Sequence, residues 1–396
     1  MRGLRATLIA VAIFAAPTVI RAQTPPDHLN LCGRFVSEAA NAAPEAPGTI
    51  AAPHRDEPPP PLGVALGPRK IAVMLLTLPD ATRSITPEQA RTVVFTGPRS
   101  ANAFYREVSQ DRISLRGVLN PVDGDVFGPY ALPAPATRRM CDLGGWTEQA
   151  EGRAAADGFH IAAYDSVVVV NPYTAACPFF GYTTYGFPNT VWLNGLVLTG
   201  IVAHELGHNF GLRHAASLAL CTQGEPAPSC TSYEFEPFDV MGESPERHFS
   251  AWHLYLLGLL PSSSVKVARK SGTYKLEPSE LSRHGVRLLL VPSPDRNPDG
   301  SPSGWIGLEI RVRSGVFDDF APDDPVVRGV SVRRVGTPYL PDTGEDSDSI
   351  LLDPTPLTGP SDAPLQAGQS LTDPVTHVRV TMLGIGGRWA RVRIDL

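Results

Sequence analysis

The stretch that organises the chain spans residues 204–214 and reads His204-Glu205-Leu206-Gly207-His208-Asn209-Phe210-Gly211-Leu212-Arg213-His214. Residues four apart on a helix lie one turn apart on the same face, so His204 and His208 can offer two imidazoles to one ion. Val202, Leu206 and Phe210 repeat at the same spacing. We therefore expect a helix that packs its apolar face on a sheet and turns its histidines into a cleft.

Gly211 is expected to end this helix, because glycine accepts the backbone angles of a sharp turn that a side chain opposes. The turn then carries His214 back as a third ligand. Three neutral imidazoles leave the fourth tetrahedral position open for water, which is typical of a catalytic zinc site. Bound zinc lowers the pKa of its water to about 7, and Glu205 is the candidate base. The motif thus predicts one catalytic zinc ion, with Glu205 as the catalytic residue.

Two other interpretations of this motif remain. A chance match of the full pattern is expected roughly 10⁻⁵ to 10⁻⁴ times per chain of this composition. The third ligand could instead be a downstream acid, as in thermolysin-like enzymes, and the candidates are Glu225, Glu234 and Glu236. The offsets of Gly211 and His214 favour the histidine.

The extended motif resembles that of the metzincin zinc peptidases, which carry a methionine turn beneath the metal. Asp239-Val240-Met241-Gly242 matches that turn. Over about residues 70–260 the chain is most similar to the gametolysin family, through the motif itself, the turn, and residues 249–253, which read Phe-Ser-Ala-Trp-His. The resemblance implies an α/β (α+β) metzincin-like catalytic domain, Met241 as the structural methionine, and hydrolysis of peptide bonds in extracellular proteins.

Two features near the motif are less specific. Some metzincins place a tyrosine two residues after the turn methionine, but this chain has Glu243 there. Tyr233 is the other candidate, and the second oxyanion donor is left unassigned. His248 and His253 are interpreted as surface or core histidines rather than ligands.

Residues 189–194, directly before the motif, alternate like an exposed strand. In the family's fold such an edge strand binds substrate as an added β-strand. This assigns substrate binding to Thr190, Val191, Trp192 and Leu193. An ordinary edge strand is the alternative.

The N-terminus predicts a secretory signal over residues 1–22, cut after Ala22. Its apolar run, about 15 residues, is shorter than the roughly 20 needed to span a bilayer. We therefore expect a secreted protein, extracellular or periplasmic, with no membrane anchor. Loss of three arginines with the signal takes the net charge from −6 to −9, and no basic patch is expected to hold nucleic acid. The expected partners are protein or peptide substrates.

Composition and the pattern of apolar residues divide the rest of the chain into three segments. Residues 23–69 are rich in Pro and Ala and are interpreted as a leader or short pro-segment. Residues 70–261 are assigned to the peptidase domain, because buried-strand patterns alternate there with helical ones. The strands are expected at 71–76, 113–118 and 166–171, and the helices at 86–95, 99–109 and 146–158. Residues 262–396 show short alternating runs separated by Gly, Pro and Asp, which predicts an all-β sandwich domain.

Five cysteines follow the signal, and an odd count leaves one unpaired in an oxidising compartment. Cys221 and Cys230 are expected to pair because they are close in sequence, and Cys141 and Cys177 by elimination. Cys32 remains, followed by a glycine in the leader. In many metzincins such a thiol occupies the fourth metal position and keeps the enzyme latent. An exposed or intermolecularly paired cysteine is the alternative.

Residues 295–300 resemble the start of a calcium loop, but Ile306 stands where the bidentate Glu is expected. A polar turn is therefore favoured over a calcium site.

Three classes of function compete: a secreted zinc endopeptidase, a catalytically idle zinc-containing binding module, and an exported adhesin. The presence of Glu205 favours the endopeptidase, since a catalytically inactive metal site needs no general base beside the ion.

Overall fold

The computed structural model describes residues 56–63, 66–81, 85–183, 189–219, 233–242, 246–280, 284–336, 347–355, 358–386 and 388–396. The predicted signal at 1–22, Cys32, and the predicted pair Cys221–Cys230 lie outside the described residues. Within the described part, none of the helices has the length and apolar character needed to cross a membrane.

The first sheet has the strand order β2-β1-β4-β6-β5, and β3 also pairs with β1. The bounds are β1 (Gly67–Thr77), β2 (Ile113–Arg116), β3 (Asp125–Ala131), β4 (Ser166–Asn171), β5 (Gly181–Thr183) and β6 (Asn189–Asn194). All pairs are parallel except β5 with β6. The expected strands at 71–76, 113–118 and 166–171 are confirmed, although β1 begins at Gly67, inside the range interpreted as the leader.

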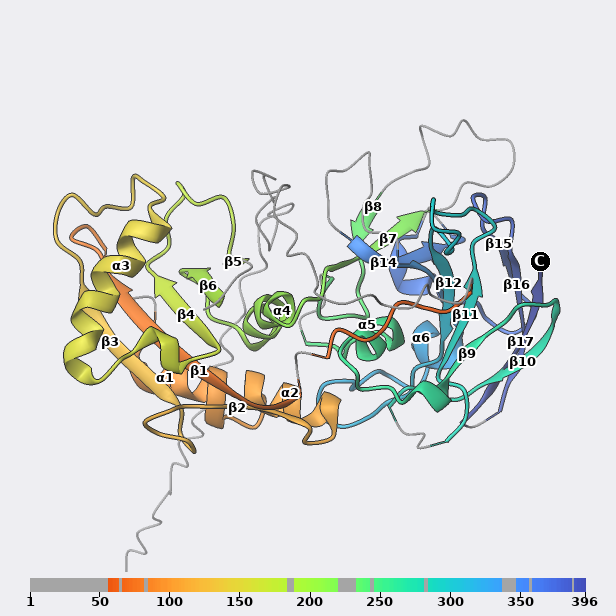
Figure 1. The fold of residues 1–396 in the computed structure, drawn as a ribbon, viewed down its shortest axis with the longest axis horizontal. Coiled ribbons are helices and arrows are strands. Elements are labelled where there is room, and N and C mark those ends of the chain that lie inside the picture. The colour runs from red at the N-terminus through yellow and green to blue at the C-terminus, as the bar shows by residue number, and fades with distance from the viewer. Residues whose placement is uncertain are drawn as a thin grey trace, which may run out of the picture.

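Helices cover both faces of this sheet (Figure 1). The bounds are α1 (Pro87–Arg91), which continues as a π-helical turn over Thr92–Thr96, α2 (Ala101–Ser109), α3 (Leu143–Ala154) and α4 (Thr199–Asn209). Because side chains alternate along β1, Ala72 and Met74 pack with Trp146 of α3, whereas Ile71 and Val73 pack with α2 and α4. The helices expected at 86–95, 99–109 and 146–158 are thus confirmed with small shifts.

The prediction that residues 189–194 form an exposed edge strand was wrong. β6 pairs with β4 on one side and β5 on the other, and Thr190 to Asn194 are buried. The alternation was misleading because Asn194 is polar yet buried. Its side chain accepts a hydrogen bond from the Thr174 amide and donates to the carbonyls of Thr174, Cys177 and Phe179. β5 is the outer strand of the described sheet.

Two further sheets form the C-terminal part. The long sheet has the order β8-β7-β14-β13-β12-β11-β9, and the short sheet has the order β10-β17-β16-β15. Their bounds are β7 (His214–Ala219), β8 (Tyr233–Phe235), β9 (Val265–Val267), β10 (Gly272–Leu276), β11 (Leu288–Pro292), β12 (Trp305–Glu309), β13 (Ser331–Val335), β14 (Ser347–Asp353), β15 (Ser370–Thr372), β16 (Arg379–Ile385) and β17 (Ala390–Asp395). Apolar side chains of both sheets, such as Val291 and Val392, share one core. The expected two-sheet β architecture is present.

The long sheet extends across the domain boundary that the sequence placed at 261/262. β7 and β8 precede that point, yet β7 pairs in parallel with β14 over Ser347 to Asp353. The helices of this region are α5 (Ala251–Leu256) and the short α6 (Pro325–Arg328). Figure 1 shows α4 and α5 between the first sheet and the C-terminal sheets.

Residues 56–63 lie against the C-terminal part of the molecule. The Leu62 amide donates to the Leu256 carbonyl at 2.7 Å, and the Tyr255 hydroxyl donates to the Pro59 carbonyl at 2.7 Å. Asp56 pairs with Arg296 at 2.7 Å. The last part of the predicted leader is therefore packed onto the fold.

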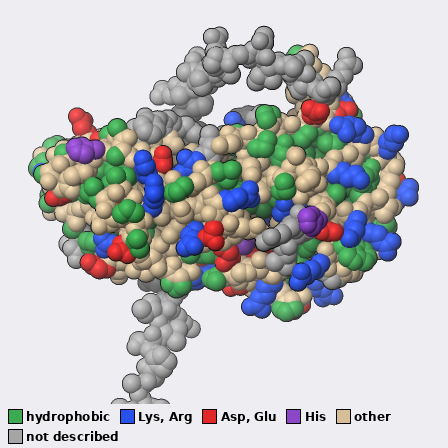
Figure 2. All heavy atoms as spheres, turned by 60° about the horizontal axis from the view of Figure 1, so that its bottom comes forward, with side chains coloured by type: hydrophobic (Ala, Val, Ile, Leu, Met, Phe, Trp, Pro, Cys, Tyr) green, Lys and Arg blue, Asp and Glu red, His purple; other side chains and the backbone are tan. Residues whose placement is uncertain are grey.

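Basic side chains gather over the C-terminal sheets, on the right-hand side of Figure 2. Lys275, Arg379, Arg391 and Arg393 are exposed on the short sheet, and Lys275 lies directly opposite Arg391. Two of these cations are paired, Lys275 with Glu277 and Arg393 with Asp395, and the expectation that no basic patch holds nucleic acid stays a prediction.

The structure contains the expected disulfide Cys141–Cys177, which links the start of α3 to the loop before β5 across a sequence separation of 36 residues. We predict that the double change Cys141→Ser/Cys177→Ser lowers the free energy of unfolding by up to about 4 kcal/mol, because a cross-link of this loop length restricts the unfolded chain. Urea unfolding measures the difference. Non-reducing peptide mapping that joined Cys141 to Cys221 would contradict the pairing.

Candidate metal centre

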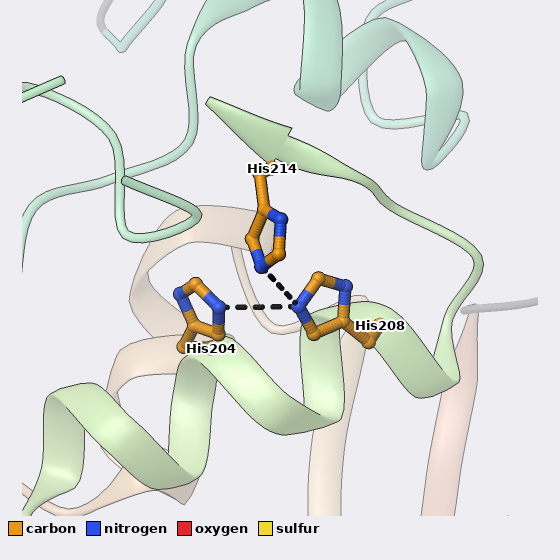
Figure 3. A group of neighbouring side chains, drawn as sticks. All are labelled: His204, His208 and His214. Carbon is orange, nitrogen blue, oxygen red and sulfur yellow. Dashed lines mark hydrogen bonds between the residues drawn. The ribbon is translucent and has the colours of Figure 1, made fainter. Parts of the chain in front are cut away.

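Helix α4 carries the first two histidines. Val202 and Leu206 pack in the core shared with the first sheet, and Gly211 follows the helix with φ +94°, a left-handed conformation that favours glycine. β7 then begins at His214. Figure 3 shows the three rings converging from α4 and β7, as the sequence predicted.

The three imidazoles are spaced as ligands of one ion. Nε2 of His208 lies 3.1 Å from Nε2 of His204 and 3.2 Å from Nε2 of His214. Tetrahedral coordination with Zn–N bonds of about 2.0–2.1 Å separates neighbouring ligand atoms by about 3.3 Å. All three side chains are buried, and their ligand atoms lie within 4.8 Å of one another. The histidines therefore form a site that can bind a metal ion.

Backbone carbonyls orient two of the rings. Nδ1 of His204 donates to the Val240 carbonyl at 2.8 Å, and Nδ1 of His208 donates to the Leu212 carbonyl at 2.9 Å. A carbonyl can only accept, so each bond fixes the tautomer that leaves the Nε2 lone pair for a metal.

Burial also keeps the rings neutral. It lowers the pKa of His204 to about 4 and that of His214 to about 3, and it lowers the pKa of His208 well below its usual value. The neutral imidazole is the form that binds a metal, so the site is ready for an ion at neutral pH.

Residues 239–242 form a turn beneath α4. Met241 is fully buried, and a Cβ on Gly207 would lie only 2.4 Å from its Sδ atom. Position 207 therefore requires glycine for the turn to approach the helix. The Met241 carbonyl accepts from the Ala215 amide at 2.9 Å, next to the third histidine. The predicted structural role of Met241 fits this position.

Glu205 is buried and lies next to the outer strand β5. A Cβ on Gly181 would come within 2.2 Å of the Glu205 Oε1 atom, so the absence of a side chain at 181 leaves room for the carboxylate. No pattern in the sequence indicates this contact, because Gly181 is one of 36 glycines.

The other predicted site residues are placed as follows. Glu236, an alternative third ligand, is buried and paired with Arg333. His248 and His253 are buried and paired with carboxylates, and neither belongs to the group of three ligands. Thr190, Val191, Trp192 and Leu193 lie in the buried strand β6. Residues 295–300 form a turn in which Asn297 donates to Ser301. The side chains of Tyr233 and Glu234, and residues Glu225 and Glu243, lie outside the described part.

No model of a known protein family matches this chain, and neither does any curated protein. Its function is therefore inferred from the geometry of the site.

We predict that His214→Ala binds added Zn²⁺ more weakly than the wild type does. The loss of a ligand should weaken binding by more than the roughly 10–100-fold that follows removal of a group that only orients a ligand. Zinc per chain after dialysis is the measurement, and His160→Ala, an exposed histidine, is the control. Stoichiometric zinc in His214→Ala would show that the third ligand lies elsewhere.

Proposed function

We propose that this chain is a secreted zinc-dependent endopeptidase of the metzincin type, similar to gametolysins, that hydrolyses peptide bonds of extracellular proteins. One observation carries the proposal: His204, His208 and His214 form a buried group, and Glu205, a buried carboxylate, lies on helix α4 between the first two. A structural zinc site has no need of that carboxylate, and a three-histidine site keeps a position open for water.

The donor set fits zinc, because neutral imidazoles suit that ion and the ring spacing matches its tetrahedral geometry. When bound, zinc lowers the pKa of a water to about 7 and polarises a peptide carbonyl. The three histidines hold the ion, and their own protonation is suppressed by burial. Glu205 accepts a proton from the attacking water and passes it to the leaving amine.

The outer strand β5 is the proposed substrate-binding strand, in place of residues 190–193. Among the described strands β5 pairs with β6 alone, so its other side forms an edge of the first sheet. Gly181 of β5 lies beside Glu205. An extended peptide that pairs with this edge receives main-chain hydrogen bonds and brings its own backbone near the carboxylate.

A second candidate is a catalytically idle, zinc-containing binding or adhesion module. The exposed basic face of the short sheet, with Lys275 and Arg391 directly opposite each other, favours a recognition role for the C-terminal part. The two candidates differ in whether the base at position 205 matters for turnover.

We predict that Glu205→Gln keeps zinc and the fold but lowers hydrolysis of a denatured protein by about 10²- to 10⁴-fold, since it removes the base and spares the ligands. Zinc content, thermal melting and cleavage rate are measured together. Glu148→Gln, an exposed change on α3, is the control. Turnover close to wild type in Glu205→Gln would reject the mechanism, and zinc without any cleavage in the wild type would favour the binding module.

We also predict that Gly181→Ala retains zinc and lowers kcat/KM by about 10- to 100-fold, because the added methyl group displaces the Glu205 carboxylate and a shift near 1 Å has costs of this order. Gly152→Ala is the matched control, since nothing lies within 4 Å of a Cβ there. Equal kcat/KM in Gly181→Ala and the wild type would show that Glu205 does not depend on this contact.

A further inference from the structure

Two consecutive residues of β14, Ser347 and Asp348, lie against the metal centre although they come from the C-terminal part of the chain. Ser347 is the register partner of His214 in the parallel pair β14–β7. Asp348 contacts His253 of α5, whose Nε2 lies 3.0 Å from the Asp348 carboxylate. The same strand thus contacts the third ligand's backbone and a buried histidine.

His253 is held between two carboxylates. Its Nδ1 lies 2.7 Å from Asp239, and both of these side chains are fully buried. Burial alone would lower the pKa of His253, but the charges of Asp239 and Asp348 outweigh it and raise that pKa to about 10. The ring is therefore an imidazolium at neutral pH and donates a hydrogen bond from each nitrogen.

Asp239 connects this contact to the metal ligands. Its carboxylate accepts from the Met241 amide at 2.8 Å and from the Ser250 amide at 2.7 Å. It thereby fixes the turn 239–242, whose Val240 carbonyl holds the His204 ring. A chain of buried contacts runs from Asp348 through His253 and Asp239 to the first ligand.

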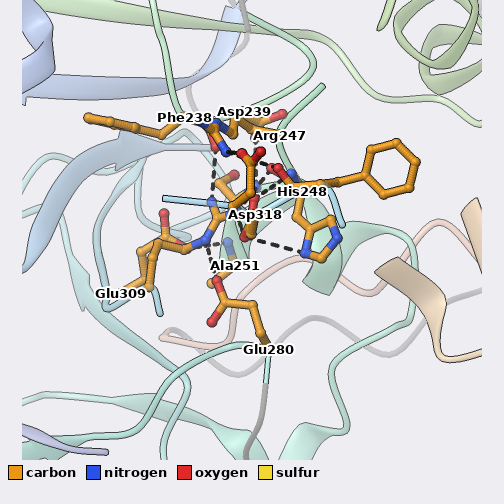
Figure 4. Close-up of polar contacts among 12 residues, drawn as sticks. Phe238, Asp239, Arg247, His248, Ala251, Glu280, Glu309 and Asp318 are labelled. Carbon is orange, nitrogen blue, oxygen red and sulfur yellow. Dashed lines mark hydrogen bonds and ion pairs between the residues drawn. The ribbon is translucent and has the colours of Figure 1, made fainter. Parts of the chain in front are cut away.

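A second buried contact joins α5 to the long sheet. Glu309 of β12 accepts from the Ala251 amide at the start of α5 and pairs with Arg333 at 2.9 Å. Figure 4 draws the polar contacts around this junction, with Asp239, Ala251 and Glu309 labelled. The start of α5 and the turn are therefore placed by residues of the long sheet.

We propose that Asp348 is a positioning residue for the metal centre, which acts through His253 on Asp239 and so holds the turn and the His204 ring in their metal-binding arrangement. This inference rests on the proposed zinc site and not on peptidase activity. By this proposal the long sheet helps to form the metal centre. Among the described residues, His214 of β7 is the only ligand that the long sheet supplies.

The test measures metal binding by the full chain. Asp348→Asn keeps the shape of the side chain and removes its charge, and we expect Zn²⁺ affinity, measured by competition with a chromophoric chelator, to fall about 10-fold. The visible spectrum of the Co²⁺-loaded protein should shift, because the His204 ring moves. Asp348→Glu should recover part of the affinity.

The matched control is Asp373→Asn. Asp373 is also buried and pairs with Arg334 of the long sheet, but it does not contact α5 or the turn 239–242. We expect it to lower the free energy of unfolding of the metal-free protein while leaving Zn²⁺ affinity and the Co²⁺ spectrum unchanged.

The pathway is tested with His253→Gln, a change expected to weaken Zn²⁺ binding by itself. Adding Asp348→Asn to it should cause no further loss, because Asp348 acts through that ring. Wild-type affinity in Asp348→Asn, an equal loss in Asp373→Asn, or additive losses in the double variant would each overturn the proposal. A wild-type protein that binds no Zn²⁺ would overturn the proposed function as well.

Discussion

The structure depends on one geometric constraint: three imidazole nitrogens from two different sheet systems must meet at one point. His204 and His208 lie on a helix packed against the first sheet, whereas His214 begins a strand of the long sheet. Zinc–nitrogen distances vary by only about 0.2 Å in working sites. The two parts of the molecule must therefore be held to within a few tenths of an ångström, which loose domain packing does not achieve.

Glu107 of α2 joins the two parts by accepting hydrogen bonds from the Val316 and Phe317 amides, and buried ion pairs stiffen the C-terminal part itself. Arg333 pairs with Glu236 and Glu309, and Arg311 pairs with Glu280 and Asp318, all of them nearly inaccessible to solvent. Such pairs contribute little net stability, because desolvation of the charges offsets their attraction. Removal of one partner, however, costs about 3–5 kcal/mol, since the other charge is left buried alone. These pairs therefore resist displacement within the C-terminal part, whose long sheet carries His214.

Local patterns in the sequence predicted much of this fold. Continuous apolar runs identified β1 and β4, and the spacing of His204, His208 and Gly211 identified α4 and its end. The contacts that the sequence could not predict are those between residues far apart in the chain. Nothing near His214 indicates that it pairs with Ser347, and Asn194 looked exposed because the loop carbonyls that it satisfies come from residues 174–179. The close contacts at Gly181 and Gly207 are invisible for the same reason, because a glycine shows only that a side chain is absent.

These pairings change how the C-terminal part should be understood. A separate sandwich domain could be removed or exchanged without effect on the metal centre, as the boundary at 261/262 implied. Here the strand that begins with His214 has β14 as a parallel neighbour, and the Ala251 amide at the start of α5 donates a hydrogen bond to Glu309. A parallel neighbour fixes both the position and the direction of β7 along its length. The sandwich is thus structurally continuous with the metal centre, and any recognition by its basic outer face occurs on a body that is rigidly connected to the histidines.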